Sequence, residues 1–284
     1  MALPRAFVVF LTFFTASEAF FSSAMLELDR ESALNTLDHA IITKIGLLRC
    51  LIEFLKDNPQ YVDQEMALKF EDLQRMVITA GTPNKVQNVF SVMMSRMRLQ
   101  NVITEIESSN SELNTAPLRS VAAAHFNGEQ FKEGSKRLLE LKSQIVKSLL
   151  KGVKFEYARQ LAGQYLHTLQ DFYSHSNWVE LINGNRKFYS LTNPANSIPS
   201  QYVAKPNEET CTSCPLAIEQ NDNCDNNLII KKITSGYHGR QDISKPANIS
   251  KCGHGGILDS SRNRGTRGGI NKEAATRKWS PHYK

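Results

Sequence analysis

The sequence predicts an all-α protein, a helical bundle followed by a disulfide-stapled, loop-rich C-terminal extension. Two observations lead to this prediction. Apolar residues recur at three- and four-residue spacing through much of residues 25–182, which is the period of an amphipathic helix. After Gly184 the chain becomes rich in Asn, Ser, Pro and Gly, and this part holds four of the five cysteines. We therefore divide the chain into a helical domain at 20–184, a cysteine-containing loop region at 185–260 that packs on it, and a basic, flexible tail at 261–284.

The first 19 residues have the pattern of a secretory signal peptide. Arg5 precedes an apolar run from Ala6 to Phe14, and small residues follow at Ser17 and Ala19. The apolar run is too short to cross a membrane, and no later segment approaches 18 consecutive apolar residues. We expect cleavage after Ala19, no transmembrane segment, and a secreted protein with an extracellular partner.

Four stretches of helical periodicity make up the bundle. They are Leu34–Leu55, Val86–Ile106, Leu138–Leu150 and Phe155–Leu181. Asn58-Pro59 ends the first helix, and Thr82-Pro83 opens the second. The polar run from Ser108 to Pro117 predicts a loop. Gly184 ends the last helix.

The cysteines predict two disulfides in the loop region. Four cysteines allow three pairings, and they are Cys211, Cys214, Cys224 and Cys252. A zinc ribbon is the competing interpretation of Cys211 and Cys214, but an exported chain favours disulfides. Cys50 lies in an apolar helical pattern and is predicted to be a buried free thiol. Asn248 begins the Asn-Ile-Ser glycosylation sequon, in a region with the composition of a loop.

Positive charge is concentrated at the C-terminus. The net charge is +6, and residues 262–284 hold seven Lys and Arg against one acidic residue, Glu273. The tail therefore accounts for the whole excess and could contact an acidic polymer or lipid headgroups. We do not expect nucleic acid as a partner, because aromatic residues do not alternate with the basic ones as in nucleic-acid-binding modules.

Residues Tyr165–Glu180 carry the chemistry of the chain. His167, Asp171 and His175 recur every four residues and so share one face of a helix. Imidazole and carboxylate groups are ordinary zinc ligands, although a solvated outer face is the alternative interpretation. Because His167 and His175 are about 12 Å apart along the helix axis, both cannot reach one ion from a straight helix. Asp171 could instead bridge two ions.

Several strings together resemble a known family. They are AAHFNGEQFKEGSKRLL, HTLQDFYSHSNWVEL, SGYHG, KCGHGG, GGINKE and SPH. This set resembles the N-terminal domain of the von Willebrand factor A domain-containing protein 7 family, over roughly residues 25–284. That family in turn resembles the fungal Het-C proteins and, more remotely, the zinc-dependent phospholipase C and nuclease superfamily. The resemblance implies a phospholipase C-like helical bundle with zinc as its cofactor.

The resemblance also implies a set of metal ligands. Matched residue by residue, they are His167, Asp171, His175, His125, His39 and His282. Asp38 is then the nearest candidate to orient His39, because ligating histidines usually donate their second ring nitrogen to an acceptor. His238 and His254 lie in glycine-containing loops and are given no metal role.

Departures from the superfamily pattern favour a protein without catalytic activity. Residues 118–124 contain no carboxylate before His125, and Ala40 and Ile41 stand where relatives carry acidic residues. The chain also stops at Lys284, where the family continues toward a von Willebrand factor A domain, so we expect a truncated form. We predict a secreted, non-catalytic or vestigial metal-binding or interaction module. The alternative is a zinc-dependent phosphodiester hydrolase of the phospholipase C or nuclease type.

Overall fold

The computed structural model describes twelve segments of the chain. They are residues 20–21, 37–61, 100–115, 117–152, 154–182, 191, 198–213, 227–229, 231–255, 259–263, 266 and 268–272. The predicted signal peptide, most of the predicted helix at 86–106, and the last twelve residues lie outside these segments.

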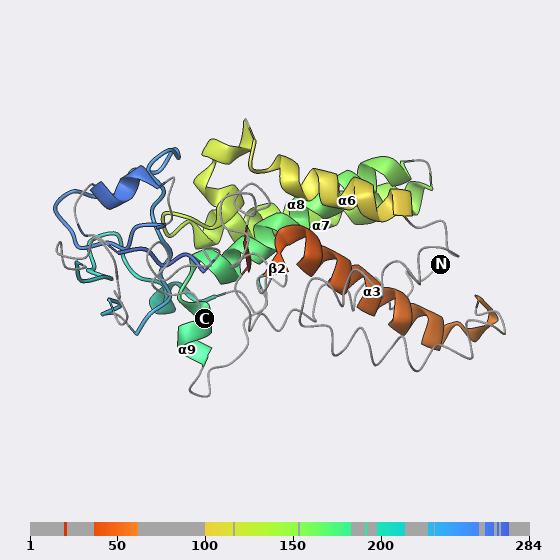
Figure 1. Cartoon of the computed structure of the whole chain (residues 1–284), viewed down its shortest axis with the longest axis horizontal. Coiled ribbons are helices and arrows are strands. Elements are labelled where there is room, and N and C mark those ends of the chain that lie inside the picture. Colours follow the sequence, from red (N-terminus) through yellow and green to blue (C-terminus); the bar gives the residue numbers. More distant parts are fainter. Residues whose placement is uncertain are drawn as a thin grey trace.

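The described chain is built around four long helices, in agreement with the predicted all-α class. They are α3 (His39–Asp57), α6 (Gln100–Glu112), α7 (Phe131–Lys151) and α8 (Phe155–His175). Helix α8 packs against both α6 and α7, and α3 lies across α6 and α8 (Figure 1). Two short strands, β1 (Phe20–Phe21) and β2 (Leu37–Asp38), pair in parallel just before α3. The core between the helices includes the buried side chains Phe126, Leu138, Leu166 and Phe172.

The N-cap residue of helix α3 determines where the helix begins. The sequence pattern predicts a start near Leu34, but the helix starts at His39, directly after Asp38. The Asp38 backbone is extended, and its carboxylate accepts a hydrogen bond from the Ile41 N–H at 2.7 Å. This contact satisfies one of the N–H groups that a helix N-terminus leaves without a partner. His39 is thereby fixed as the first helical residue.

Helix α6 runs further than predicted, so the predicted loop at Ser108–Pro117 was wrong for residues 108–112. The helix continues through Glu112. Ser109 and Asn110 are buried in it rather than solvated. The Ser109 hydroxyl donates to the Gln160 carbonyl on α8, and the Asn110 amide bonds to groups on α3 and α8. The polar run is helical because its side chains meet polar partners inside the bundle.

Helices α7 and α8 form a hairpin. The apolar face of α7 buries Phe131, Leu138, Leu141 and Ile145 against the bundle. The hairpin turns at Gly152, whose φ of 67° lies in the left-handed region that glycine adopts without strain. The predicted helices at 138–150 and from Phe155 are thus confirmed, with α7 starting earlier than predicted.

The predicted helix Phe155–Leu181 is divided in two. Helix α8 ends at His175, and the short α9 (Trp178–Ile182) follows. Ser176 is extended and bridges Ser235, while the Asn177 N–H donates to the Thr234 carbonyl. The break occurs because these backbone groups bond to the loop region instead of continuing the helix.

The loop region packs at the C-terminal end of α8 (Figure 1). Beyond Ile182, the described residues contain only 3-10 turns, η6 (Ser200–Tyr202) and η7 (Ser260–Asn263), and isolated strand bridges. A disulfide joins Cys211 to Cys252. Cys214 and Cys224, the other two cysteines predicted to form disulfides, lie outside the described residues. The described residues therefore contain one of the two predicted disulfides.

Sequence analysis predicted a buried free thiol at Cys50, which lies on α3. Cys50 is a free thiol, as predicted, but it is half-buried rather than fully buried. Burial and the neighbouring Glu53 charge raise the pKa of Cys50 to about 12.

None of the helices in the described segments is long and apolar enough to cross a bilayer.

Candidate metal centre

Asp171 lies at the centre of a group of imidazoles. Its neighbours on α8, one turn away on each side, are His167 and His175. The Nε2 atom of His167 lies 3.1 Å from Asp171 Oδ2, and that of His175 lies 3.9 Å from Oδ1. The four-residue spacing thus turns both rings toward one carboxylate, although they stand on opposite sides of it.

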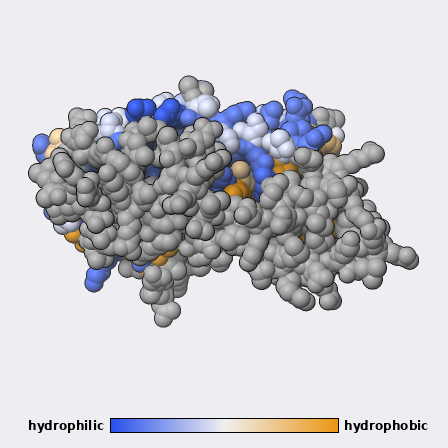
Figure 2. Space-filling view, in the orientation of Figure 1, coloured by the Kyte–Doolittle hydropathy of each residue, from blue (hydrophilic) through white to orange (hydrophobic). Residues whose placement is uncertain are grey.

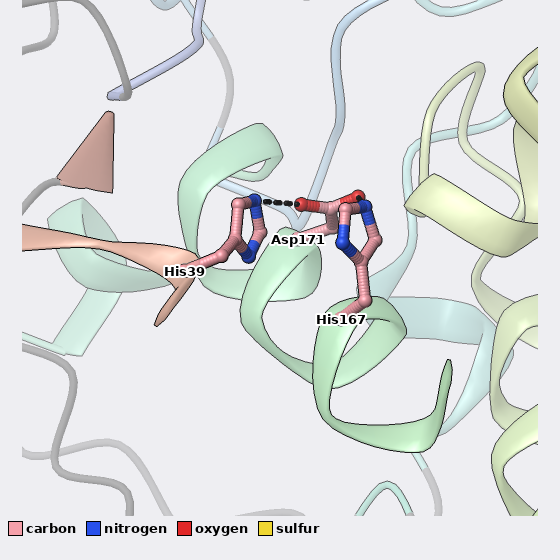
Figure 3. A group of neighbouring side chains, drawn as sticks. All are labelled: His39, His167 and Asp171. Carbon is pink, nitrogen blue, oxygen red and sulfur yellow. Dashed lines mark ion pairs between the residues drawn. The ribbon is translucent and has the colours of Figure 1, made fainter. Parts of the chain in front are cut away.

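Two more histidines reach the same carboxylate from other elements. His39, the first residue of α3, places its Nε2 atom 3.3 Å from Asp171 Oδ1. His125 ends η4 (Ala122–His125), and its Nδ1 atom lies 2.7 Å from Asp171 Oδ2. Figure 3 shows His39 entering from α3 and pointing at the pair His167 and Asp171 on α8. The structure therefore brings together five of the six residues predicted as ligands, and His282 lies outside the described residues.

All five side chains are buried. Their exposed fractions are at most 6%, and those of His167 and Asp171 are 0% and 1%. The alternative of a solvated helix face is therefore wrong for this motif. A carboxylate so far from water needs positive charge or hydrogen-bond donors around it.

Two side-chain amides orient His39 and His167. The Gln170 Nε2 group donates to the His39 carbonyl, which can only accept, so Gln170 Oε1 faces the His39 ring at 2.6 Å from Nδ1. The Asn110 Nδ2 group donates to the same Oε1, which leaves Asn110 Oδ1 at 3.1 Å from His167 Nδ1. Both amides also donate to Thr43 Oγ1. Each histidine therefore carries its proton on Nδ1 and turns the lone pair of Nε2 toward Asp171.

Backbone carbonyls orient His125 and His175 in the same way. His175 Nδ1 lies 2.8 Å from the His125 carbonyl oxygen. His125 Nε2 lies 3.3 Å from the Leu118 carbonyl oxygen. Since a carbonyl can only accept, these outer nitrogens carry the protons. The inner Nε2 of His175 then faces the carboxylate as a lone pair, whereas the inner Nδ1 of His125 lies within hydrogen-bond distance of Asp171 Oδ2, at 2.7 Å.

This arrangement fits a cation. An ionised carboxylate is also only an acceptor, and the inner nitrogens of His39, His167 and His175 face it without a proton, so the centre gathers lone pairs. Asp171 Oδ1 is buried and accepts no hydrogen bond from any described residue. Protonating all four rings on both nitrogens would bury four positive charges around one negative charge, at a cost of several kcal/mol for each uncompensated ion. These groups could hold a metal ion, because deprotonated imidazole and carboxylate are metal ligands.

Electrostatics at the centre point the same way. Burial lowers the pKa of His167 to about 4, although the Asp171 charge opposes this effect. Burial on its own would raise the pKa of Asp171, but its interactions with His167 and His175, together with the hydrogen bond from His125, bring it well below its usual range. At neutral pH the centre therefore holds a neutral His167 beside an ionised Asp171, the forms that bind metals.

Three of the five residues lie close enough to share one ion. One ligand atom each from His39, His167 and Asp171 falls within 4.8 Å of the others. His125 and His175 flank this triad on the Oδ2 and Oδ1 sides of Asp171. A single centre built on the triad is thus better supported than the two ions bridged by Asp171 that helix spacing allowed.

The structure gives Asp38 a different role from the one predicted. Asp38 caps α3, and the Nδ1 atom of His39 bonds to Gln170 rather than to the Asp38 carboxylate. Sequence analysis did not identify Gln170 or Asn110. Their only available signals were that Gln170 adjoins Asp171 and that Asn110 lies in a polar run.

A second group of histidines lies beside the centre. The His254 ring is 4.4 Å from that of His175 and 5.0 Å from that of His238, between ring centroids. The Asp259 carboxylate accepts from the Gly239 and Gly255 N–H groups, so it joins the two loops that carry these histidines. Burial, followed by repulsion from His254, lowers the pKa of His238 to about 3. The Asp259 oxygens also accept from the N–H and the hydroxyl of Ser261, so its hydrogen bonds are made within the loops.

Comparison with known proteins identifies the family. The family model described as the VWA7 N-terminal domain matches residues 81–284, which include four of the five residues at the centre. Over 67% of its own length, the chain is 34% identical to mouse von Willebrand factor A domain-containing protein 7. It is 30% identical to the rat protein over 89% and 28% identical to the human protein over 99% of its length.

The chain spans only 20–29% of the length of these relatives. No solved structure matches the chain. The family model nevertheless covers well over half of the sequence, including α6, α7, α8 and the described loop region. The chain therefore belongs to the VWA7 N-terminal domain family.

Proposed function

We propose that this chain is a metal-binding helical module in which a buried divalent ion, zinc, holds α3, η4 and α8 together. The observation that carries the proposal is the orientation of the four histidines. Each gives its outer N–H to an oxygen acceptor and turns its inner nitrogen toward Asp171. Without a cation, the inner lone pairs and the carboxylate would repel one another.

Zinc fits the donor atoms of the centre. Imidazole nitrogens and a carboxylate oxygen are common zinc ligands, and zinc imposes no geometry of its own on a site. Magnesium and calcium prefer sets of oxygen ligands, and this centre offers one carboxylate among four imidazoles. Cobalt and nickel share these preferences in vitro and serve as spectroscopic substitutes.

Burial supports a structural ion over a catalytic one. A catalytic zinc keeps a position open to water and substrate, whereas a structural zinc is enclosed by protein ligands. Every candidate ligand in the described chain is at least 94% buried. The candidates also come from three segments that lie 42 to 136 residues apart in the sequence, so an ion there would cross-link the bundle.

The test is the metal content of the purified chain. We expect close to one zinc per chain after dialysis, measured by elemental analysis, and a lower melting temperature after chelation. Asp171→Asn keeps the shape of the side chain but loses its charge, so it should reduce zinc to well under half an ion. The matched control is Asp57→Asn on the exposed end of α3, which should leave zinc unchanged.

The same preparations separate the structural role from the hydrolase alternative. A chromogenic phosphodiester is incubated with the zinc-loaded and the chelated protein. Zinc without turnover supports the structural role, and turnover that chelation abolishes would replace it with hydrolysis. If Asp171→Asn retains a full complement of zinc, the proposed centre is wrong.

Export is part of the proposal. The disulfide between Cys211 and Cys252 is typical of an oxidising compartment, and Asn248 of the sequon is exposed in a loop. Expression in a secreting cell line should yield a protein in the medium that begins at Phe20. A glycosidase should reduce its mass, and Asn248→Gln should remove that effect. Retention of the chain in the cytosol would contradict export.

A further inference from the structure

The turn between α7 and α8 presents large apolar side chains to solvent. Leu150 is 62% exposed, Phe155 51% and Tyr157 44%. The Tyr157 hydroxyl bonds back to Gln144 on α7, so its ring is held at the surface of the hairpin. Around the turn the space is open, since a side chain at Gly152 would meet no atom within 4 Å. The described surface in Figure 2 is mainly hydrophilic, so this apolar group is an exception to it.

Lysines surround the apolar group. Lys147, Lys151 and Lys154 are all exposed, and none of them pairs with a carboxylate in the described part of the chain. Glu156 is the one acidic residue among positions 147–157. The next basic residue on α8, Arg159, is already paired with Glu105 on α6. The hairpin tip, residues 147–152 and 154–157, is therefore both apolar and positively charged.

We propose that this hairpin tip binds the surface of a bilayer that contains anionic phospholipid. Exposed apolar side chains beside lysines are the combination by which peripheral proteins hold such surfaces, with rings and aliphatic chains among the headgroups and ammonium groups on the phosphates. Each lysine near an anionic surface contributes about a fivefold gain in binding. The apolar side chains distinguish this surface from one that binds a soluble acidic polymer, which needs charge alone.

The tip is separate from the metal centre. Phe155 and Asp171 lie at opposite parts of α8, 16 residues apart, or about 24 Å along the helix axis. The centre is covered at the other end by the loop region, whose backbone bonds to His175 and Ser174. Membrane binding through the tip therefore does not depend on the metal, and either proposal can fail without the other.

The test is sedimentation of the purified chain with lipid vesicles. Vesicles of phosphatidylcholine alone are compared with vesicles of phosphatidylcholine and phosphatidylserine in a three-to-one ratio. We expect binding to the second kind only, and a loss of at least tenfold for Leu150→Ser combined with Phe155→Ser. Lys151→Glu should lose roughly fivefold or more. Because these side chains are exposed, circular dichroism should remain unchanged.

Matched controls lie elsewhere on the described surface. Tyr202→Ser combined with Ile229→Ser removes two other exposed apolar side chains. Lys136→Glu reverses the charge of a lysine near the N-terminal end of α7, away from the tip. Neither control should change vesicle binding. The proposal is overturned if anionic vesicles do not bind the chain. It is equally overturned if the serine variants bind as well as the parent, since binding would then rest on charge alone.

Discussion

Single hydrogen bonds decide what the residues at the centre can do. An imidazole offers a donor and an acceptor, and the partner of one nitrogen determines the role of the other. At His39 and His167 those partners are the amides of Gln170 and Asn110. An amide that does not contact Asp171 thereby determines whether an imidazole lone pair is available to the proposed ion.

Gln170→Leu should therefore weaken metal binding although Gln170 is not a ligand. Loss of its Oε1 atom removes the acceptor for both His39 Nδ1 and the Asn110 amide. Substitutions of this kind lower metal affinity by about 10- to 100-fold. Titration of the metal-free chain with zinc in the presence of a competing chelator measures the change. Gln160→Leu, on the exposed side of α8, is the control and should retain the parent affinity.

Buried histidines also make the metal-free chain sensitive to acid. Burial lowers the pKa of His167 to about 4 and that of His238 to about 3, whereas both titrate near 6.5 once unfolded. Between these values the unfolded chain binds protons that the folded chain does not, so stability falls as the pH drops from about 6.5 toward 4. Melting temperatures of the chelated protein at pH 7, 6, 5 and 4 should decrease steadily. His238→Asn should reduce the slope, and a flat profile would contradict the burial of these rings.

At the scale of elements, close packing of α6 on α8 positions the centre. Gly163 on α8 faces the α6 backbone, where a methyl group would lie 2.4 Å from the Ile106 carbonyl oxygen and 2.8 Å from the Asn110 nitrogen. Glycine is thus needed for its small size. The close approach also lets Asn110 reach across to Gln170 and His167.

Gly163→Ala should consequently impair both stability and metal binding. The added methyl forces α6 away from α8 and moves Asn110 from its partners. We expect a loss of about 1–3 kcal/mol in the free energy of unfolding, the usual cost of overpacking a core, together with weaker zinc binding. Urea denaturation and zinc titration measure the two effects. Unchanged zinc affinity in a destabilised variant would show that Asn110 does not position His167.

The same elements show what the sequence can predict. Helices α7 and α8 follow apolar periodicity and were predicted, because their stability comes from one buried face. The end of α6 was missed, since Ser109 and Asn110 look like loop residues until partners more than 50 positions away are known. The division after His175 was missed for a similar reason, as Asn177 bonds to residues of the loop region.

The residues of the candidate centre also differ in whether the sequence could predict them. His167, Asp171 and His175 follow from spacing within one helix, and the family resemblance added His39 and His125. Neither method could identify Asn110 and Gln170, because an amide that accepts from an imidazole has no characteristic spacing in sequence. Such contacts are set by tertiary packing, which the order of residues does not display.

At the scale of the whole molecule, a buried ion pair joins the bundle to the loop region. Lys251 is fully buried and lies 2.8 Å from both oxygens of Glu129, two residues before α7 begins. Glu129 also accepts from the hydroxyls of Thr234 and Tyr237, and Lys251 donates to the Lys205 carbonyl. The disulfide from Cys211 to Cys252 anchors the residue next to Lys251. The loop region is therefore part of the folded unit.

Removing one partner of this pair should cost more than removing both. Lys251→Met leaves the Glu129 carboxylate buried without its cation, and burial alone already raises the pKa of Glu129. We expect a loss of about 3–5 kcal/mol, which Glu129→Gln in the same chain should partly restore. Lys232→Met is the matched control, since its ion pair with Glu208 is partly exposed to solvent and should contribute much less to stability. Urea denaturation of the two single variants, the double variant and the control measures these differences. Equal losses for Lys251→Met and Lys232→Met would mean that the loop region is held to the bundle by the disulfide and backbone contacts, not by the buried charges.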